Sequence, residues 1–223
     1  MSRNFDGTDD NVDFGSDASI DDFTAWSVAF WIDLQTPSST YDVIVDKGYN
    51  GSTVGKRPMS SSTFSGFMEI EVGWSGGRGY WGFPKPTNGR HHMVWTYDGA
   101  SASNVPLGYL NGVAQTTTTG ATPSGTLGSD AASSLRIGET NGGGQDFVGK
   151  LEHFVYVDRI ITAAEVNRHR WWGRPSGAMK VCHPMVTDKL GNEGSATADG
   201  TATGATVASL VTPVQRPGMG TAL

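Results

Sequence analysis

Carboxylate side chains gather near the N-terminus, and carboxylates are the groups that bind hard cations. Asp6, Asp9 and Asp10 follow Phe5 closely, and Asn11 comes directly after them. A calcium site needs about six to eight oxygens that converge on one point, whereas Asp and Asn side chains in a tight turn bond to the nearby backbone. The spacing therefore favours turn chemistry over metal binding, and we predict no metal ligand here.

A second pair of carboxylates lies in the segment FMEIEV at 67–72. Its alternation of apolar and acidic residues predicts a strand that buries one face and turns Glu69 and Glu71 outward. Retaining hydrolysis of a glycosidic bond requires two carboxyl groups about 5 Å apart with opposite protonation roles. Because no further acid follows Glu71 on this segment, we interpret both glutamates as solvated residues of a strand face.

The remaining reactive side chains do not form a catalytic set. His91 and His92 are adjacent in a predicted strand, so they point to opposite faces and cannot ligate one metal together. Cys182 is the only cysteine, and no local signature marks it as a reactive thiol. The sequence contains no nucleophile elbow, no H-E-x-x-H pair and no phosphate-binding glycine loop. We therefore predict no catalytic residue, and a protein that is not an enzyme.

The elements around these residues read as short strands and tight turns. The segment 91–97 is rich in β-branched and aromatic residues, as strands are, and the dipeptide Asn111-Gly112 tolerates the positive φ of a two-residue hairpin turn. The run 23–32 is apolar on both faces, which predicts a central strand covered on two sides. Thr162 and Glu165 have the spacing of a capping box, so we expect one short helix near 162–172.

Composition excludes several classes of function. Charged residues make up 17% of the 223 positions and the formal net charge is −6, so no basic face predicts nucleic-acid binding. No apolar run approaches about 18 residues, so we expect neither a membrane span nor a secretion signal. A single cysteine excludes an intrachain disulfide. Glycine supplies 31 positions, which is typical of a fold with many tight turns.

Trp74, Tyr80 and Trp81 could together form an aromatic surface for a ligand. Aromatic rings bind sugars by stacking, but they also supply much of the packing energy of cores and interfaces. We favour the core or a subunit interface for this trio, and the sequence alone identifies no carbohydrate-binding residue.

Three segments resemble the laminin-G-like, or concanavalin A-like lectin-glucanase, jelly-roll domains. They are FDGTDDNVDF at 5–14, HHMVWTYDG with YLNG between 91 and 112, and LRIG with FVGKLEHFVYVDR between 135 and 159. The resemblance implies an all-β fold, a two-sheet antiparallel jelly-roll sandwich that occupies residues 1–174. Arg90 stands where this family usually has Trp.

The resemblance also bears on the acidic residues. Glucanases of this fold carry an E-x-D-x-(x)-E strand, and the acids beyond Glu71 that would complete it are missing. Pentraxins, which are related lectins, bind calcium on the loop that holds Glu139, Asn141 and Gln145 here. That loop is short and lacks the acid pair of the pentraxins, so we predict no cofactor, with a structural calcium ion as the alternative.

The range 175–223 differs in composition and is assigned to an extended C-terminal arm. It is poor in large apolar residues, so a free arm would not bury enough surface to become ordered. We expect it to lie along the domain or along neighbouring subunits. His183-Pro184, Leu190-Gly191-Asn192 and the run GATVA at 204–208 resemble tails that follow laminin-G-like domains in structural proteins of tailed bacteriophages.

Three functions follow from these patterns. The first is a virion structural protein, a decoration or head-surface protein on the capsid, which partners the major capsid protein or other virion subunits and forms a homo-oligomer within the assembly. The second is a carbohydrate-binding module, and the third a glycoside hydrolase, against which the missing acid argues. For the first we predict a set of aromatic, basic and valine contact residues: Arg168, Arg170, Trp171, Trp172, Val207, Val211 and Val214.

Overall fold

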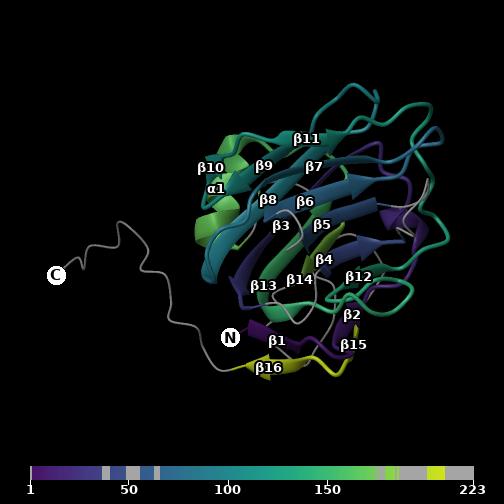
Figure 1. Cartoon of the computed structure of the whole chain (residues 1–223). Helices are drawn as coiled ribbons and strands as arrows, with labels where there is room; N and C mark the ends of the chain where they lie inside the picture. The colour runs from purple at the N-terminus through teal and green to yellow at the C-terminus, as the bar shows by residue number, and fades with distance from the viewer. Residues whose placement is uncertain are drawn as a thin grey trace.

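A computed structural model describes residues 2–36, 41–48, 56–62, 66–173, 175, 179–183, 185 and 200–208 of the chain. Two antiparallel sheets pack face to face, and one helix lies outside them (Figure 1). The sandwich confirms the predicted all-β jelly-roll fold. No helix in these ranges is long and apolar enough to cross a membrane.

Each sheet contains eight strands in the described part of the chain. Sheet A runs in the order β10 (Val113–Ala114), β9 (Leu107–Leu110), β8 (Gly89–Asp98), β3 (Ala25–Leu34), β13 (Val148–Val157), β1 (Ser2–Asp6) and β16 (Thr206–Ala208), and β14 (Val181–His183) also pairs with β13. Sheet B runs in the order β11 (Thr118–Ala121), β7 (Gly79–Pro84), β6 (Phe67–Val72), β5 (Lys56–Ser62), β4 (Tyr41–Lys47), β12 (Leu135–Ile137), β2 (Asn11–Asp13) and β15 (Thr201–Thr203). A short 3-10 helix, η1 (Ala18–Ile20), precedes β3.

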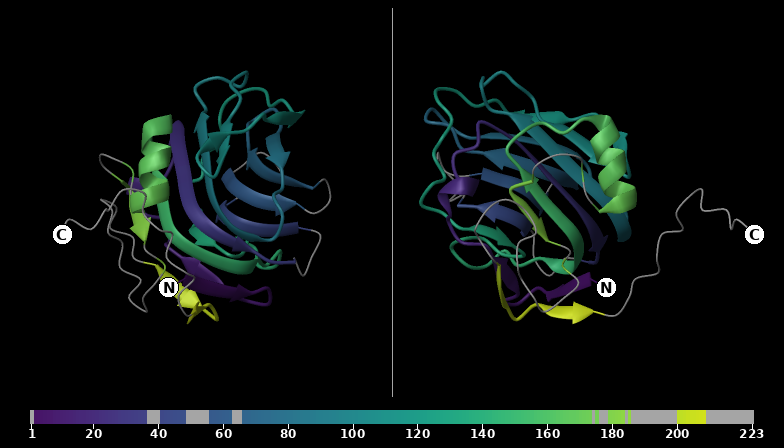
Figure 2. Two further views of the ribbon diagram at one scale, coloured as in Figure 1. Left: turned by 90° about the vertical axis from the view of Figure 1, so that its left-hand side faces the viewer. Right: turned by 180° about the vertical axis from the view of Figure 1, so that it is seen from behind.

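Two separate apolar layers hold the sandwich together. The main core lies between the sheets, where Trp26, Trp95 and Phe83 are fully buried. A smaller cluster on the outer face of sheet A includes Ala29 and Val166 and is covered by helix α1 (Ala163–Trp172) (Figure 2). This second layer confirms that the strand predicted at 23–32 is covered on both faces.

Helix α1 begins and ends at the predicted residues. The Thr162 hydroxyl accepts a hydrogen bond from the Glu165 amide at 3.3 Å, and the Glu165 carboxylate accepts one from the Thr162 amide at 2.9 Å. Gly173 adopts φ +72°, and its N–H bonds to the His169 carbonyl at 2.8 Å. The capping box and the left-handed glycine therefore define both ends of the helix, as the sequence indicates.

Segments from the C-terminal range join the sheets of the domain. Strand β14 pairs with β13, β15 pairs with β2 in sheet B, and β16 pairs with β1 in sheet A. Residues 200–208 thus connect the two sheets along one side of the sandwich (Figure 1). Inside this connection the Arg3 guanidinium donates to the Ala205 carbonyl at 2.8 Å. These segments extend the sheets beyond residue 174, and a docking role for the range 175–223 stays a prediction.

Candidate functional site

A groove on the outer face of sheet B is the best candidate for a ligand site. Met68 and Trp81 point into the core, so their sequence neighbours on β6 and β7 face outward. The groove has a volume of about 130 Å³. It is lined by side chains and glycines of three adjacent strands: Phe67, Glu69, Tyr80, Gly82, Thr118 and Gly120.

Two glycines make room for this groove. A Cβ atom on Gly120 would lie 1.8 Å from Cε2 of Tyr80, so the tyrosine ring packs against bare backbone at this position. Gly120 also lies at a register shift between β11 and β7, where a bulge re-aims the neighbouring side chains. A Cβ on Gly82 would meet the Phe67 Cβ at 3.0 Å and the Glu69 Cγ at 3.2 Å. Larger residues at either glycine would fill the groove.

The glutamates of β6 are buried, and the expectation that they are solvated was wrong. Glu69 is 7% exposed and Glu71 is 2% exposed. Both face outward as predicted, but Tyr80 is the cross-strand partner of Glu71, and the Arg78 guanidinium lies 3.7 Å from its carboxylate. Alternation along a strand gives the direction of a side chain, whereas its exposure depends on what the neighbouring strands and loops place over it.

The aromatic trio divides between the core and the groove. Trp74 and Trp81 are 3% and 1% exposed and belong to the main core, as predicted. Tyr80 lies on the opposite face of β7 and is partly exposed in the groove. The Arg78 guanidinium lies 5.4 Å from the Tyr80 ring centroid. Only the tyrosine of the three therefore offers a ring to a ligand.

The acidic turn near the N-terminus follows the predicted turn chemistry. The Asp10 carboxylate accepts a hydrogen bond from the Asp6 amide, and the Asp6 carboxylate accepts one from the Thr8 amide at 3.0 Å. Carboxylate oxygens of Asp6, Asp9 and Asp10 lie within 4.8 Å of one another. Burial, followed by the nearby charges of Asp6 and Asp9, raises the pKa of Asp10.

The loop between β12 and β13 lies beside this turn. Asn11 donates to the Glu139 carboxylate at 2.8 Å, and Asn141 donates from its backbone and its side chain to the Asp46 carboxylate, both at 2.8 Å. The backbone carbonyl of Gln145 accepts from Val43. The polar groups of Glu139 and Asn141 are thus engaged within the protein, as is the backbone of Gln145.

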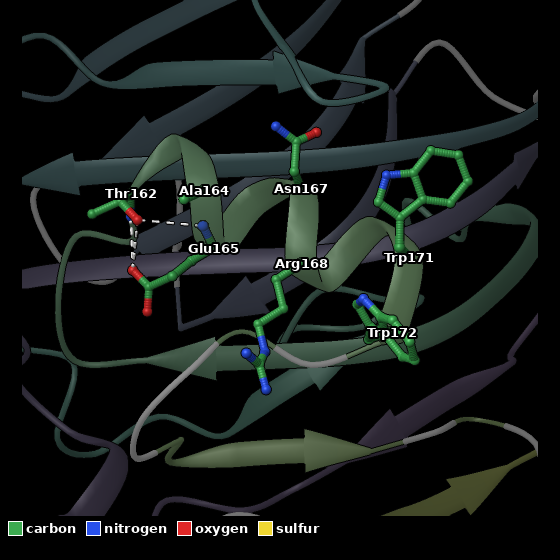
Figure 3. A pocket seen from close by; sticks show the side chains of 7 residues that line it. All are labelled: Thr162, Ala164, Glu165, Asn167, Arg168, Trp171 and Trp172. Atoms are coloured by element: carbon green, nitrogen blue, oxygen red, sulfur yellow. Dashed lines mark hydrogen bonds between the residues drawn. The ribbon is translucent and has the colours of Figure 1, made fainter. Parts of the chain in front are cut away.

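The predicted assembly contacts lie in two places. Arg168 and Trp172 are exposed on helix α1, with Trp172 at 61%, and the Arg170 guanidinium lies 4.8 Å from the Trp171 ring centroid. Figure 3 shows the hollow of about 700 Å³ along this helix, lined by Thr162, Ala164, Glu165, Asn167, Arg168, Trp171 and Trp172. Val207 belongs to β16, away from the helix in Figures 1 and 2. Val211 and Val214 lie outside the described residues.

Arg90 and His92 pack on the outer face of sheet A, near the end of helix α1. The Arg90 guanidinium lies 3.9 Å from the Trp31 ring centroid and 2.9 Å from the Glu152 carboxylate. Arginine therefore stacks on a tryptophan at the position where related domains usually have Trp. His92 is fully buried against His169 of the helix, while the side chain of its neighbour His91 bonds to the Thr87 carbonyl. The two histidines have separate environments, as predicted.

The two-sheet antiparallel sandwich agrees with the family that the sequence comparison identifies. The chain belongs to the concanavalin A-like lectin/glucanase superfamily, because the Laminin_G_3 family model matches residues 6–167. A comparison with curated protein sequences finds no match. Nothing in the family match or the structural likenesses supports the resemblance of the C-terminal range to phage proteins.

Several solved structures share the fold at low sequence identity. A Bacteroides ovatus protein to which carbohydrate binding has been provisionally assigned is 17% identical with a TM-score of 0.67, over 96% of this chain and 60% of that one. A heptameric pentraxin of Limulus polyphemus is 16% identical with a TM-score of 0.52, over 76% of this chain and 81% of that one. The NanB sialidase of Streptococcus pneumoniae is 12% identical with a TM-score of 0.51, over 74% of this chain and 26% of that one. These likenesses show a common fold.

Proposed function

We propose that this protein is a non-catalytic carbohydrate-binding module, and that a sugar residue binds in the groove of sheet B. The observation that carries the proposal is the partly exposed Tyr80 ring beside the Glu69 carboxylate, over a floor made by Gly82 and Gly120. Ligand sites combine apolar walls with a few placed polar groups, and this groove has that composition.

The chemistry of a sugar matches the two kinds of group in the groove. A pyranose presents C–H groups on one face, which pack against an aromatic ring, and hydroxyl groups at its edge, which donate hydrogen bonds. Tyr80 and Phe67 supply aromatic surface, and Glu69 supplies a carboxylate, which forms stronger hydrogen bonds than a neutral acceptor. The hydroxyl of Thr118 adds one further donor or acceptor at the rim. The two glycines allow the side chains of Tyr80, Phe67 and Glu69 to lie close to the sheet, which leaves the space above them for the ligand.

Glycan binding and its dependence on Tyr80 test the proposal directly. We expect the protein to bind at least one member of a panel of soluble plant and bacterial polysaccharides. The Tyr80→Ala variant should bind it about tenfold more weakly, because stacking on an aromatic ring contributes up to about 1.5 kcal/mol and about 1.4 kcal/mol corresponds to a factor of ten. Trp172→Ala, which removes an exposed ring on the other side of the molecule, should bind like the parent protein. Equal affinity of Tyr80→Ala would contradict the groove assignment.

Hydrolysis is the competing function of the same groove. Glu69 and Glu71 stand two positions apart on one strand face, and no acid follows them on β6. We expect no release of reducing sugar from any polysaccharide that binds. Release that disappears in the Glu69→Gln variant would show that the protein is an enzyme.

An assembly role is the second candidate, and the exposed Trp172 beside Arg168 favours it. Trp and Arg are the residues most enriched at interface hot spots. On this proposal the protein is a virion structural protein that decorates a capsid, and helix α1 contacts other subunits. Trp172→Ala and Arg168→Glu should then reduce co-sedimentation with capsids without lowering thermal stability. If electron micrographs of purified virions show the protein on neither the head nor the tail, this role is ruled out.

A further inference from the structure

Helix α1 is held to sheet A by a hydrogen bond between two buried histidines. His92 on β8 and His169 on the helix are both 0% exposed. Nε2 of His92 lies 2.8 Å from Nδ1 of His169, and the two rings lie 5.0 Å apart between centroids. The main sandwich core lies on the other face of the sheet, so this pair belongs to the helix interface alone.

The neighbouring backbone determines where the protons are. Nε2 of His169 lies 2.8 Å from the His153 carbonyl on β13, and a carbonyl only accepts, so Nε2 carries a proton. In the neutral ring Nδ1 of His169 is then an acceptor, and His92 must donate to it from its own Nε2. Nδ1 of His92 is left as an unprotonated nitrogen, buried and without a hydrogen-bond partner in the described structure. The contact therefore requires both imidazoles to be neutral.

The charged groups around the pair oppose a positive imidazole. Arg90 from β8 and Arg170 from the helix both act on His92 with a repulsive charge, and the His153 imidazole on β13 acts in the same sense on His169. The acid on β13, Glu152, is bonded to Arg90 at 2.9 Å. Trp31 from β3 contributes only its ring, 5.4 Å from that of His92. No described carboxylate therefore contacts either imidazole to compensate an added proton.

A proton added to either ring breaks the contact. On His169 it would occupy Nδ1 and face the N–H of His92, so two donors would point at each other. On His92 it would occupy Nδ1 in a buried site beside two guanidinium groups. Burial lowers the pKa of His169 to about 4, and burial followed by the His169 and arginine charges lowers the pKa of His92 well below its ordinary value.

We propose that helix α1 is released from sheet A by acid, while the two-sheet sandwich stays folded. Of its own residues the helix buries Val166 and His169, so on the helix side of the interface one apolar side chain and the histidine contact hold it to the apolar face of sheet A. The sandwich has its own core between the sheets. Release exposes the apolar outer face of sheet A at Ala29 and Tyr109. The helix is thus a pH-dependent cover on that face.

The size of the effect follows from linkage. A released histidine binds protons with a pKa near 6.5, and the docked His169 with a pKa of about 4, so acid favours the released state increasingly as pH falls from 6.5 through 4. From His169 alone, the equilibrium constant for release rises about 20-fold between pH 7 and pH 5 and more than about 100-fold by pH 4. His92 adds to this rise.

Hydrogen exchange of the full chain between pH 7 and pH 4, corrected for intrinsic exchange rates, tests the proposal. We expect the amides of α1 to lose protection by at least about 20-fold at pH 5, while amides of β3 and β13 keep theirs. In the His169→Gln variant, an amide side chain replaces both hydrogen bonds without titrating, and the acid effect should be strongly reduced. His91→Gln is the matched control and should behave like the parent protein.

Two results would overturn this inference. The first is α1 protection that stays constant from pH 7 to pH 4, or that falls equally in the parent protein and in His169→Gln. The second needs no variant: an NMR titration of the parent protein in which the His92 and His169 rings gain protons near pH 6.5 while the helix remains docked.

Discussion

A single added methyl group should close the groove of sheet B. Replacement of Gly120 by Ala places a Cβ where the nearest atom of Tyr80 is 1.8 Å away. Ordinary carbon contacts are about 3.5 Å or longer, so the tyrosine ring must move by about 1.7 Å. We expect the ring to move away from the sheet, into the space that we assign to the sugar.

The cost to stability should be small, and the cost to binding should be larger. Overpacking costs about 1–3 kcal/mol in a rigid core, but Tyr80 is partly exposed and β11 is an edge strand, so we expect the lower end of this range. For a chain of this size that corresponds to a decrease in Tm of about 2–4 °C. Displacement of the ring should weaken glycan binding about tenfold, as complete removal of the ring does.

Calorimetric titration with the bound polysaccharide and a thermal melt measure both quantities. Gly142→Ala is the matched control, because a Cβ at that position meets nothing within 4 Å, and it should change neither. If Gly120→Ala binds as tightly as the parent protein, then the ring and the sugar do not share this space, and the groove is not the binding site. A loss of Tm above about 10 °C would show instead that the β11 edge is part of the rigid core.

Three further substitutions probe other parts of the molecule. Lys47→Met removes a buried ammonium that binds the Asp21 carboxylate at 2.7 Å and the Asp130 carbonyl at 3.2 Å. We expect the free energy of unfolding, measured with denaturant, to fall by about 3–5 kcal/mol. A decrease below about 1 kcal/mol would refute this. Thr162→Ala removes the helix cap and should cost about 1 kcal/mol, whereas Thr24→Ala, an exposed control, should not change the midpoint of unfolding. Burial and the Glu139 charge raise the pKa of Asp146, so its ionised form destabilises the fold at neutral pH. Asp146→Asn should therefore raise Tm at pH 7 by about 1–2 °C, and this gain should shrink as pH falls and the wild-type carboxyl gains its proton.

Local patterns predicted those parts of the fold that depend on neighbours in sequence. The helix from Ala163 to Trp172 follows from the Thr162 and Glu165 spacing, because a capping box satisfies its own backbone groups. The turn at Asn111-Gly112 follows from the positive φ that both residues adopt. The strand over β3 follows from its two apolar faces. In each case the residues that specify the element lie within it.

The candidate site depends on contacts between strands, and these were not predictable in the same way. The groove exists because Gly120 of β11 lies under Tyr80 of β7, and the distance of 40 positions between them carries no signal in one sequence. The burial of Glu71 depends likewise on its partner Tyr80 across the β6–β7 pair. The bond between His92 and His169 joins residues 77 positions apart. Sequence reasoning singled out Tyr80 and His92 but not their partners Gly120 and His169.

The pairing of β1 with β16 has a mechanical consequence. Ser2 lies opposite Ala208 in an antiparallel register that continues through Arg3 with Val207 and Asn4 with Thr206. A force that pulls Ser2 and Ala208 apart loads one hydrogen-bonded pair of residues at a time, because both residues lie at the same end of the two-strand ladder. The β1–β16 pair would therefore separate at low force and expose Arg3. The hydrogen bonds that join β3 to β8 and β13 would carry none of this force.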